Sequence, residues 1–133
     1  IDLARNRPEK AVRKLSERLE LSPGNHPLVM AYAGALLKNE QPHIAEQVLE
    51  EQSKQRPDDP YLWYLLAEVQ GLAGNIVGLH QSRAEYFILN GVLSEAEKQL
   101  RYALRSVSSD YTTSARINER LKDVIQMKEQ LES

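Results

Sequence analysis

Apolar residues recur along this chain at intervals of three and four positions, with polar residues between them. This spacing is typical of amphipathic helices, which present an apolar face about every 3.6 residues. The pattern restarts every 16 to 18 residues, and no stretch shows the strict alternation of a half-buried strand. We therefore expect an all-α fold of about seven helices, preceded by an N-terminal stub at Ile1–Arg5.

In the first half of the chain, prolines and capping residues mark the helix boundaries. The first full helix is expected to carry Pro8 in its first turn and to end at Pro23-Gly24. Asn25 then caps a helix over residues 26–38, and Pro42 opens the next helix. The apolar faces of these helices are predicted to consist of Ala11, Val12, Leu15 and Leu19, then of Val29, Tyr32, Ala33, Leu36 and Leu37, and then of Ala45, Val48 and Leu49.

In the second half, Asp58 or Asp59 is expected to cap a helix over residues 60–72 that ends at Gly74-Asn75. A helix over residues 76–90 follows and ends at Gly91. Ser94 and Glu97 have the spacing of a capping box, so they are predicted to open the next helix, which carries Ala96, Leu100 and Ala103 inward.

The segment Asp110–Thr113 is predicted to cap a last, longer helix that reaches about residue 132. Its apolar side is expected to contain Ile117, Leu121, Val124, Ile125 and Leu131. The opposite side includes the run RINERLKD, in which Arg116 repels Arg120 and Glu119 repels Asp123, so we expect it to be a solvent-exposed face. A final helix with one very polar face suits the open end of a repeat array.

Several residue types recur exactly one repeat length apart, at a period of 34 residues. The recurring pairs are Pro23 with Pro57, Ala11 with Ala45, and Leu15 with Leu49. A period of this length indicates stacked helix pairs, so we expect a single domain over residues 1–133 with repeat-like units near 1–25, 26–59, 60–91 and 92–133. In the third unit Leu79 stands where a small residue is expected, so the helix over 76–90 is predicted to pack irregularly and to change the pitch of the superhelix.

Composition and charge narrow the function. The net charge is −2, with 41% apolar and 27% charged residues, so binding to nucleic acid or to an anionic membrane surface is not expected. No apolar run is long enough for a membrane span. The chain has no cysteine, which excludes disulfides and thiolate metal sites and leaves the compartment open. Because it starts without Met, at IDLARNRPEK, we take it to be part of a longer protein.

The helix pairs resemble the tetratricopeptide repeat, which places small residues in both of its helices and a proline near its end. A unit starting at His26 has Ala33, Ala45 and Pro57 at those places. The stretch PDDPYLWYLLAE then joins two units and starts the next one, with Trp63 and Ala67. The preceding half-unit contributes Ala11 and Pro23, and Ala96 repeats the small residue in the last unit.

A narrower resemblance lies in SRAEYFILNGVLSEAEKQLRYAL followed by the long polar helix. It is similar to the C-terminal region of the beta-barrel assembly-enhancing protease family. This resemblance implies a periplasmic protein in which an N-terminal zinc metalloprotease domain precedes the tetratricopeptide domain. It also implies, as partners, outer-membrane beta-barrel proteins, their assembly machinery and the protease domain itself. The family's HExxH motif is absent, so no catalytic residue is carried over, and we expect no cofactor in this chain, with zinc only in the protease domain.

Tetratricopeptide domains usually bind peptides on the groove lined by the first helix of each pair. The residues expected on this groove are Met30, Gly34, Leu37, Lys38, Tyr61, Tyr64, Glu68 and Leu72. Tyrosines suit such a role because tyrosine is enriched at interface hot spots. The alternative is that Tyr61 and Tyr64 only cover a neighbouring helix. The grip on a C-terminal carboxylate by Lys, Asn and Arg that some chaperone-binding members use is not expected, because Met30, Gly34, Tyr64 and Glu68 occupy the corresponding places.

Arg83 and Glu85 are further candidates, either pairing with Glu68 or lining the groove, against the simpler interpretation of a solvated face. The three histidines, His26, His43 and His80, lack the spacing of metal ligands, so no zinc site is predicted. No GxSxG motif supports a serine hydrolase. The functional prediction is thus a non-catalytic interaction module. The alternatives are a scaffold that docks on and regulates its own protease domain, and a generic tetratricopeptide adaptor.

Overall fold

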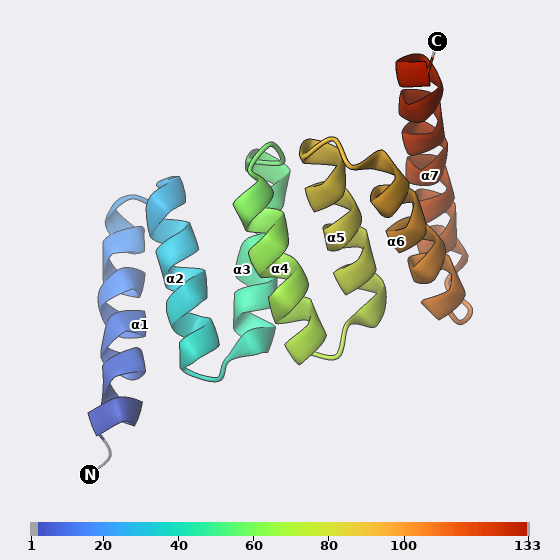
Figure 1. The fold of residues 1–133 in the computed structure, drawn as a ribbon. Coiled ribbons are helices and arrows are strands. Elements are labelled where there is room, and N and C mark those ends of the chain that lie inside the picture. Colours follow the sequence, from blue (N-terminus) through green and yellow to red (C-terminus); the bar gives the residue numbers. More distant parts are fainter. Residues whose placement is uncertain (1–2, 133) are drawn as a thin grey trace. The chain divides into compact units, whose positions relative to one another are not determined.

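The computed structural model describes the backbone of residues 3–132 and the side chains of residues 7–132. Over these residues the chain is helical with short turns and has no strand, which confirms the all-α prediction (Figure 1). The seven described helices are α1 (Leu3–Leu21), α2 (His26–Lys38), α3 (Pro42–Gln55), α4 (Pro60–Leu72), α5 (Ile76–Leu89), α6 (Leu93–Ser106) and α7 (Tyr111–Glu132).

The chain divides into two compact units, residues 1–57 and residues 58–133. In the first unit α2 packs against both α1 and α3, and in the second unit α4, α5, α6 and α7 pack each on the next. Consecutive helices within each unit run in opposite directions (Figure 1). The expectation of a single domain over residues 1–133, and that of a pitch change at the helix over 76–90, stay predictions.

Four helices begin at a side chain that accepts a hydrogen bond from an amide of the first turn. Asn25 Oδ1 accepts from the amide of Leu28 at 3.1 Å, and Asp59 Oδ1 accepts from the amide of Tyr61 at 3.0 Å. Asn75 and Asp110 do the same for α5 and α7. The predicted caps at Asn25 and Asp110 are confirmed, and Asp59 is the cap of the two candidates at that turn.

The predicted capping box at Ser94 and Glu97 is wrong. The N-cap of α6 is Val92, no side chain caps this helix, and Ser94 lies inside its first turn. Instead, the carboxylate of Glu97 accepts hydrogen bonds from Arg101 in the same helix and from Lys128 in α7. An ammonium and a guanidinium are stronger partners for a carboxylate than a backbone amide, because both partners are then charged.

The start of α1 also differs from the prediction. The helix is continuous from Leu3, so the expected stub at Ile1–Arg5 is part of it as far as the structure describes the chain, and Ile1 and Asp2 lie outside the described residues. Pro8 therefore lies beyond the first turn instead of within it. Since proline has no amide hydrogen, the helical hydrogen bond to the carbonyl of residue 4 is missing there.

Small residues let the helices approach in the first unit. Ala33 of α2 and Ala45 and Leu49 of α3 have no exposed surface. At the edge of this core, the side chains of His26 and Gln52 are hydrogen-bonded at 2.8 Å, which joins the start of α2 to the end of α3. Among the residues predicted for repeat positions, Ala33, Ala45, Ala67 and Ala96 are buried, Ala11 and Trp63 are half-buried, and Pro23 and Pro57 lie in exposed turns.

Besides the buried side of α4, the second unit has a buried cluster that lies mainly in α6 and α7. Its buried side chains are Ala84, Leu93, Ala96, Leu100, Ala103, Ile117, Leu121 and Val124. Ile125 packs against this cluster, as predicted, but Leu131 is 75% exposed, so its assignment to the apolar side of α7 is wrong.

The irregular position in the third unit has a local explanation. Leu79 replaces the expected small residue on α5, and the glycine stands on the partner helix instead. A Cβ atom built on Gly71 of α4 would lie 2.9 Å from Leu79 Cδ1. The large side chain, Leu79, lies on α5 and the small residue, Gly71, on α4. The two helices therefore still pack closely.

None of the helices that the structure describes has the length and the apolar character required to cross a bilayer.

Candidate functional site

The exposed face of α4 carries the residues that were predicted to bind a partner. Tyr61 is 58% exposed, Tyr64 56% and Leu72 63%, and Glu68 is also exposed. They lie on one side of the helix because their spacing of three and four residues follows the helical turn. The opposite side of α4 is buried through Leu62, Leu65, Leu66 and Val69.

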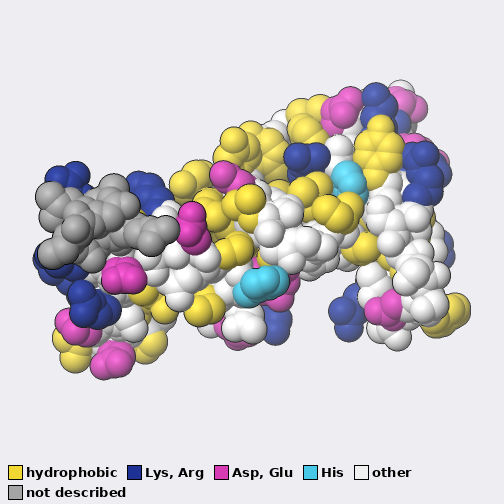
Figure 2. Space-filling view, turned by 90° about the horizontal axis from the view of Figure 1, so that it is seen from below, with side chains coloured by type: hydrophobic (Ala, Val, Ile, Leu, Met, Phe, Trp, Pro, Cys, Tyr) yellow, Lys and Arg dark blue, Asp and Glu magenta, His cyan; other side chains and the backbone are white. Residues whose placement is uncertain are grey.

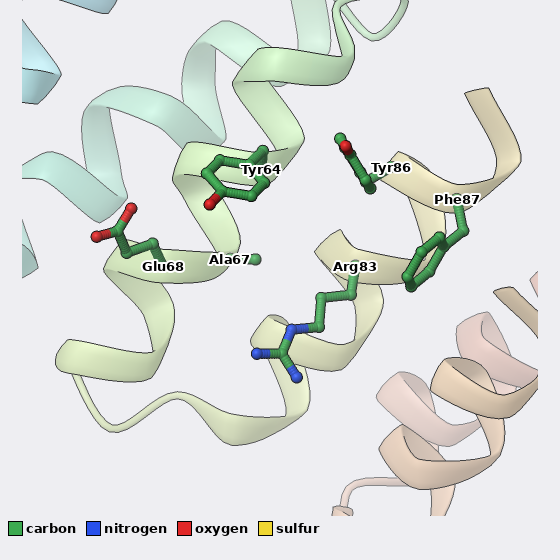
Figure 3. A pocket seen from close by; sticks show the side chains of 6 residues that line it. All are labelled: Tyr64, Ala67, Glu68, Arg83, Tyr86 and Phe87. Atoms are coloured by element: carbon green, nitrogen blue, oxygen red, sulfur yellow. The ribbon is translucent and has the colours of Figure 1, made fainter. Parts of the chain in front are cut away.

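Next to this face, α4 and α5 form a cleft with a volume of about 280 Å³. Tyr64, Ala67 and Glu68 line it from α4, and Arg83, Tyr86 and Phe87 line it from α5 (Figure 3). Ala67 is 5% exposed, and its short side chain leaves the space between the helices open. All six lining residues thus lie three or four positions from another lining residue on the same helix, as expected for two helix faces that meet.

The walls of the cleft are aromatic. The ring centroids of Tyr64 and Tyr86 are 5.7 Å apart with the planes tilted by 53°, and the rings of Tyr86 and Phe87 are 5.7 Å apart in an edge-on arrangement. Tyr64 therefore does both of the things that the sequence left open: it covers part of α5 and presents more than half of its surface to solvent.

One positively charged and one negatively charged side chain also line the cleft. Arg83 and Glu68 both line it, yet neither forms an ion pair with any side chain in the described part of the protein. Figure 3 shows the guanidinium of Arg83 between the two helices and the carboxylate of Glu68 directed away from it. The suggested pairing of Arg83 with Glu68 is therefore not formed, and Arg83 lines the cleft between α4 and α5 instead. Its place on the predicted groove stays a prediction.

Glu85 belongs to a different surface. Its two carboxylate oxygens accept hydrogen bonds from Nε and Nη2 of Arg120 in α7, both at 2.8 Å. Arg120 Nη1 also donates to Asp123 at 3.0 Å. The hydrogen bond to Glu85 raises the pKa of the Arg120 guanidinium above its ordinary value, and burial acts in the other direction.

The prediction that RINERLKD is only a solvent-exposed face is therefore wrong at Arg120. The sequence does contain Arg116 and Arg120 four residues apart, but Arg120 turns toward α5, and its side chain is 35% exposed. A guanidinium with two carboxylate partners is not limited by repulsion from a neighbouring arginine.

In the first unit, the predicted groove residues are Met30, Gly34, Leu37 and Lys38 of α2. Lys38 is exposed and the other three are half-buried, and no atom lies within 4 Å of a Cβ atom built on Gly34. The structure thus leaves open space beside Gly34. A groove shared by α2 and α4 stays a prediction, because these helices belong to different units.

Two of the three histidines take part in helix packing, and His43 is exposed. His26 is bonded to Gln52, and His80 Nδ1 lies 2.8 Å from Gln99 Oε1 while its ring packs on Tyr102. No group of three or more His, Cys, Asp or Glu side chains suited to a metal ion is found among the described residues. On the face shown in Figure 2, the described charged side chains of both signs are interspersed with exposed apolar ones.

Sequence reasoning missed Tyr86 and Phe87 as cleft residues. Tyr86 follows Arg83 by three residues, so the helical spacing contained a signal for a shared face on α5. Phe87 packs against the core of the second unit as well, and nothing in the sequence separates that role from its place in the cleft.

Two comparisons with known proteins give results. A family model described as "Tetratricopeptide repeat" matches residues 2–69, about half of the chain. The chain is also 30% identical over 129 residues to the beta-barrel assembly-enhancing protease of Escherichia coli strain K12. Proteins of the same name from Shigella flexneri and Escherichia coli O157:H7 match with the same identity and coverage. The match covers 97% of this chain and 26% of these relatives, so the chain spans about a quarter of their length.

Proposed function

We propose, from the premise that this chain belongs to the tetratricopeptide repeat family, that it is a non-catalytic module that binds other proteins. The binding surface is the exposed face of α4 together with the cleft between α4 and α5. The observation that carries this proposal is the pair Tyr61 and Tyr64, both more than half exposed beside an open aromatic cleft. Large, rigid aromatic side chains at a solvent-exposed cleft are the residue type that dominates protein interfaces.

The finer part of the proposal concerns the whole protein. The match over 97% of the chain to beta-barrel assembly-enhancing proteases supports a role beside a zinc metalloprotease domain encoded elsewhere in the protein. In this proposal the module acts in the periplasm and recruits outer-membrane beta-barrel substrates or their assembly machinery. The zinc ion then belongs to the protease domain, and this chain supplies recognition.

The test is site-specific photo-crosslinking from position 64, with p-benzoylphenylalanine in place of Tyr64 in the full-length protein inside its cell. Adducts identified by mass spectrometry as outer-membrane barrel proteins or their assembly machinery are the expected result. The matched control is the same substitution at Tyr111, a tyrosine of α7 that is 85% exposed. Position 111 should give far fewer of these adducts.

Two other outcomes would change the proposal. Adducts only to the protein's own protease domain would make this face an internal docking surface and replace substrate recruitment by regulation. Equal adducts from positions 64 and 111, or none from either, would remove the α4 face as the binding surface.

A further inference from the structure

We propose that the cleft between α4 and α5 recognises an acidic side chain next to a bulky apolar one in an extended segment of the partner protein. This inference rests on the proposed function and adds the chemistry of the partner to it. It is carried by three features of the cleft: its size, its aromatic walls and its one cationic side chain, the exposed Arg83.

The size of the cleft limits the occupant. Its volume of about 280 Å³ lies just below the range of roughly 300–1,000 Å³ that holds small-molecule ligands. The walls are the rings of Tyr64, Tyr86 and Phe87, and its base is the methyl group of Ala67. Such a space suits one bulky apolar side chain, whose burial against these rings supplies the affinity.

The cationic side chain of the cleft is Arg83. In the same unit Arg101 pairs with Glu97, Arg120 pairs with Glu85 and Asp123, and Arg105 lies 5.0 Å from the ring centroid of Tyr102. Arg83 is exposed and has no such partner within the described residues, and it lines the same cleft as the aromatic rings. A guanidinium binds a carboxylate through two parallel hydrogen bonds, so an acidic side chain complements Arg83 better than any neutral group.

The negative charge of Glu68 does not make a basic side chain the better occupant of the cleft. Its carboxylate points away from Arg83 (Figure 3), so a basic partner residue attracted to Glu68 would lie outside the cleft. As a negative charge at the rim, Glu68 weakens the binding of an acidic segment. Removing that charge should therefore strengthen binding, an effect opposite in sign to general damage of the fold.

The experiment uses crosslinking from position 61 in the full-length protein in its cell. Tyr61 is 58% exposed on the face of α4 that adjoins the cleft, but it does not line the cleft, so all cleft residues stay in place. Arg83→Gln should lower the yield of the partner adduct about fivefold, and Arg83→Lys should lower it less. Glu68→Gln should raise the yield. Arg116→Gln changes an exposed arginine of α7 and should leave the yield unchanged.

The captured segment then supplies the probe for a second measurement. A synthetic peptide with the sequence of that segment, and the same peptide with its acidic residue changed to the amide, are titrated against the purified wild-type and Arg83→Gln chains. The four dissociation constants form a double-mutant cycle, which isolates the interaction between Arg83 and the acid. We expect the acidic residue to lower the dissociation constant about fivefold for the wild-type chain and to leave it unchanged for the Arg83→Gln chain.

Each other result overturns the inference. Three outcomes would refute it while the proposed interaction function stands. The captured segment could lack an acidic residue beside a bulky apolar one, or the adduct yields could be the same in the Arg83 and Glu68 variants as in the wild type. The double-mutant cycle could also show no coupling energy. Absence of any partner adduct from both position 61 and position 64 would refute the inference and the proposed function together.

Discussion

At the scale of single residues, two glycines of the second unit define how α4 and α5 meet. Gly71 makes room for the side chain of Leu79, and Gly78 is buried against the side chains of Asn75 and Gln70. The amide of Gln70, with its NH₂ group toward α5, donates to Ser82 Oγ at 2.6 Å and to the Gly78 carbonyl at 2.9 Å. Glycine is a poor helix former, so these positions are explained by the neighbouring helix and not by local preference.

Two glycine substitutions separate the effect of contact with a neighbouring helix from the effect of helix propensity. In Gly78→Ala the new Cβ atom would lie 2.5 Å from Asn75 Nδ2 and 2.6 Å from the Gln70 amide, so we expect a loss of about 1–3 kcal/mol in the free energy of unfolding. In Gly34→Ala the Cβ atom meets no atom within 4 Å, so we expect a gain of about 0.5–1 kcal/mol from helix propensity. Urea unfolding followed by circular dichroism measures both. Changes of the same sign would contradict this account.

At the scale of elements, α7 is held to its unit by an apolar stripe and by two ion pairs that reach other helices. Ile117, Leu121 and Val124 enter the core. Arg120 then binds Glu85 of α5, and Lys128 Nζ binds Glu97 of α6 at 3.2 Å. Besides the pair between Arg120 and Asp123 on its own surface, this long charged helix is thus fixed by contacts with two other helices.

The ion pair between α7 and α5 should be measurable. Arg120→Gln leaves the partly buried carboxylate of Glu85 without its bidentate partner, so we expect a loss of about 1–2 kcal/mol in the free energy of unfolding. The control Arg116→Gln lies one turn earlier and is exposed, and it should change the stability by less than about 0.5 kcal/mol. Equal effects of the two substitutions on the urea midpoint would show that the pair with Glu85 contributes nothing.

The ion pair between α7 and α6 should make stability depend on pH. The hydrogen bond from Lys128, with a further one from Arg101, holds the pKa of Glu97 below its ordinary value of 4.5, while partial burial acts in the opposite direction. A carboxyl with a lowered folded-state pKa stabilises the fold above its unfolded-state pKa, and this contribution is lost as the pH falls below 4.5.

Glu97→Gln provides the measurement, because glutamine resembles the protonated acid. The difference in urea midpoint between the wild-type chain and this variant should be largest at about pH 6 and should shrink toward about pH 3. A difference that stays constant over this range would mean that Glu97 has an unshifted pKa in the folded chain.

At the scale of the whole molecule, the division into two units falls between Pro57 and Asp58, at the junction of two repeats. Each unit has its own buried side chains, Leu36 and Leu49 in the first and Leu100 and Ile117 in the second. In a repeat protein each helix pair contacts only its neighbours, so stability is expected to be a sum of local terms.

Matched core truncations test this locality. Leu100→Ala and Leu36→Ala both remove a leucine that is 1% exposed, and each should cost about 3 kcal/mol. Hydrogen exchange should accelerate most in α5–α7 for Leu100→Ala, because the described side chains of its core cluster lie between Val77 and Met127. For Leu36→Ala it should accelerate most in α1–α3. Uniform acceleration along the whole chain in both variants would indicate one cooperative unit.

The sequence by itself determined the helices, most of their caps and the buried small residues. Asn25, Asp59 and Asp110 were identifiable because a cap bonds an amide only two or three residues away. Ala33 and Ala45 were identifiable because each repeat needs a small residue at the same positions for its helices to pack closely. It also marked Tyr64 as a candidate for the binding surface from its place in the repeat, and Arg83 from its charge in an otherwise apolar helix.

Only the tertiary structure decided which side chains meet across helices. Glu85 and Arg120 are 35 residues apart in the chain, and no local pattern favours Arg120 over the neighbouring Arg116 as the partner. The contacts of Tyr86 with Tyr64 and of Leu79 with Gly71 also join two helices, and no local pattern in the sequence predicts them. Side-chain packing between helices depends on their distance and rotation, which the hydrophobic period leaves free. This geometry formed the cleft and left Arg83 without an ion-pair partner among the residues that the structure describes.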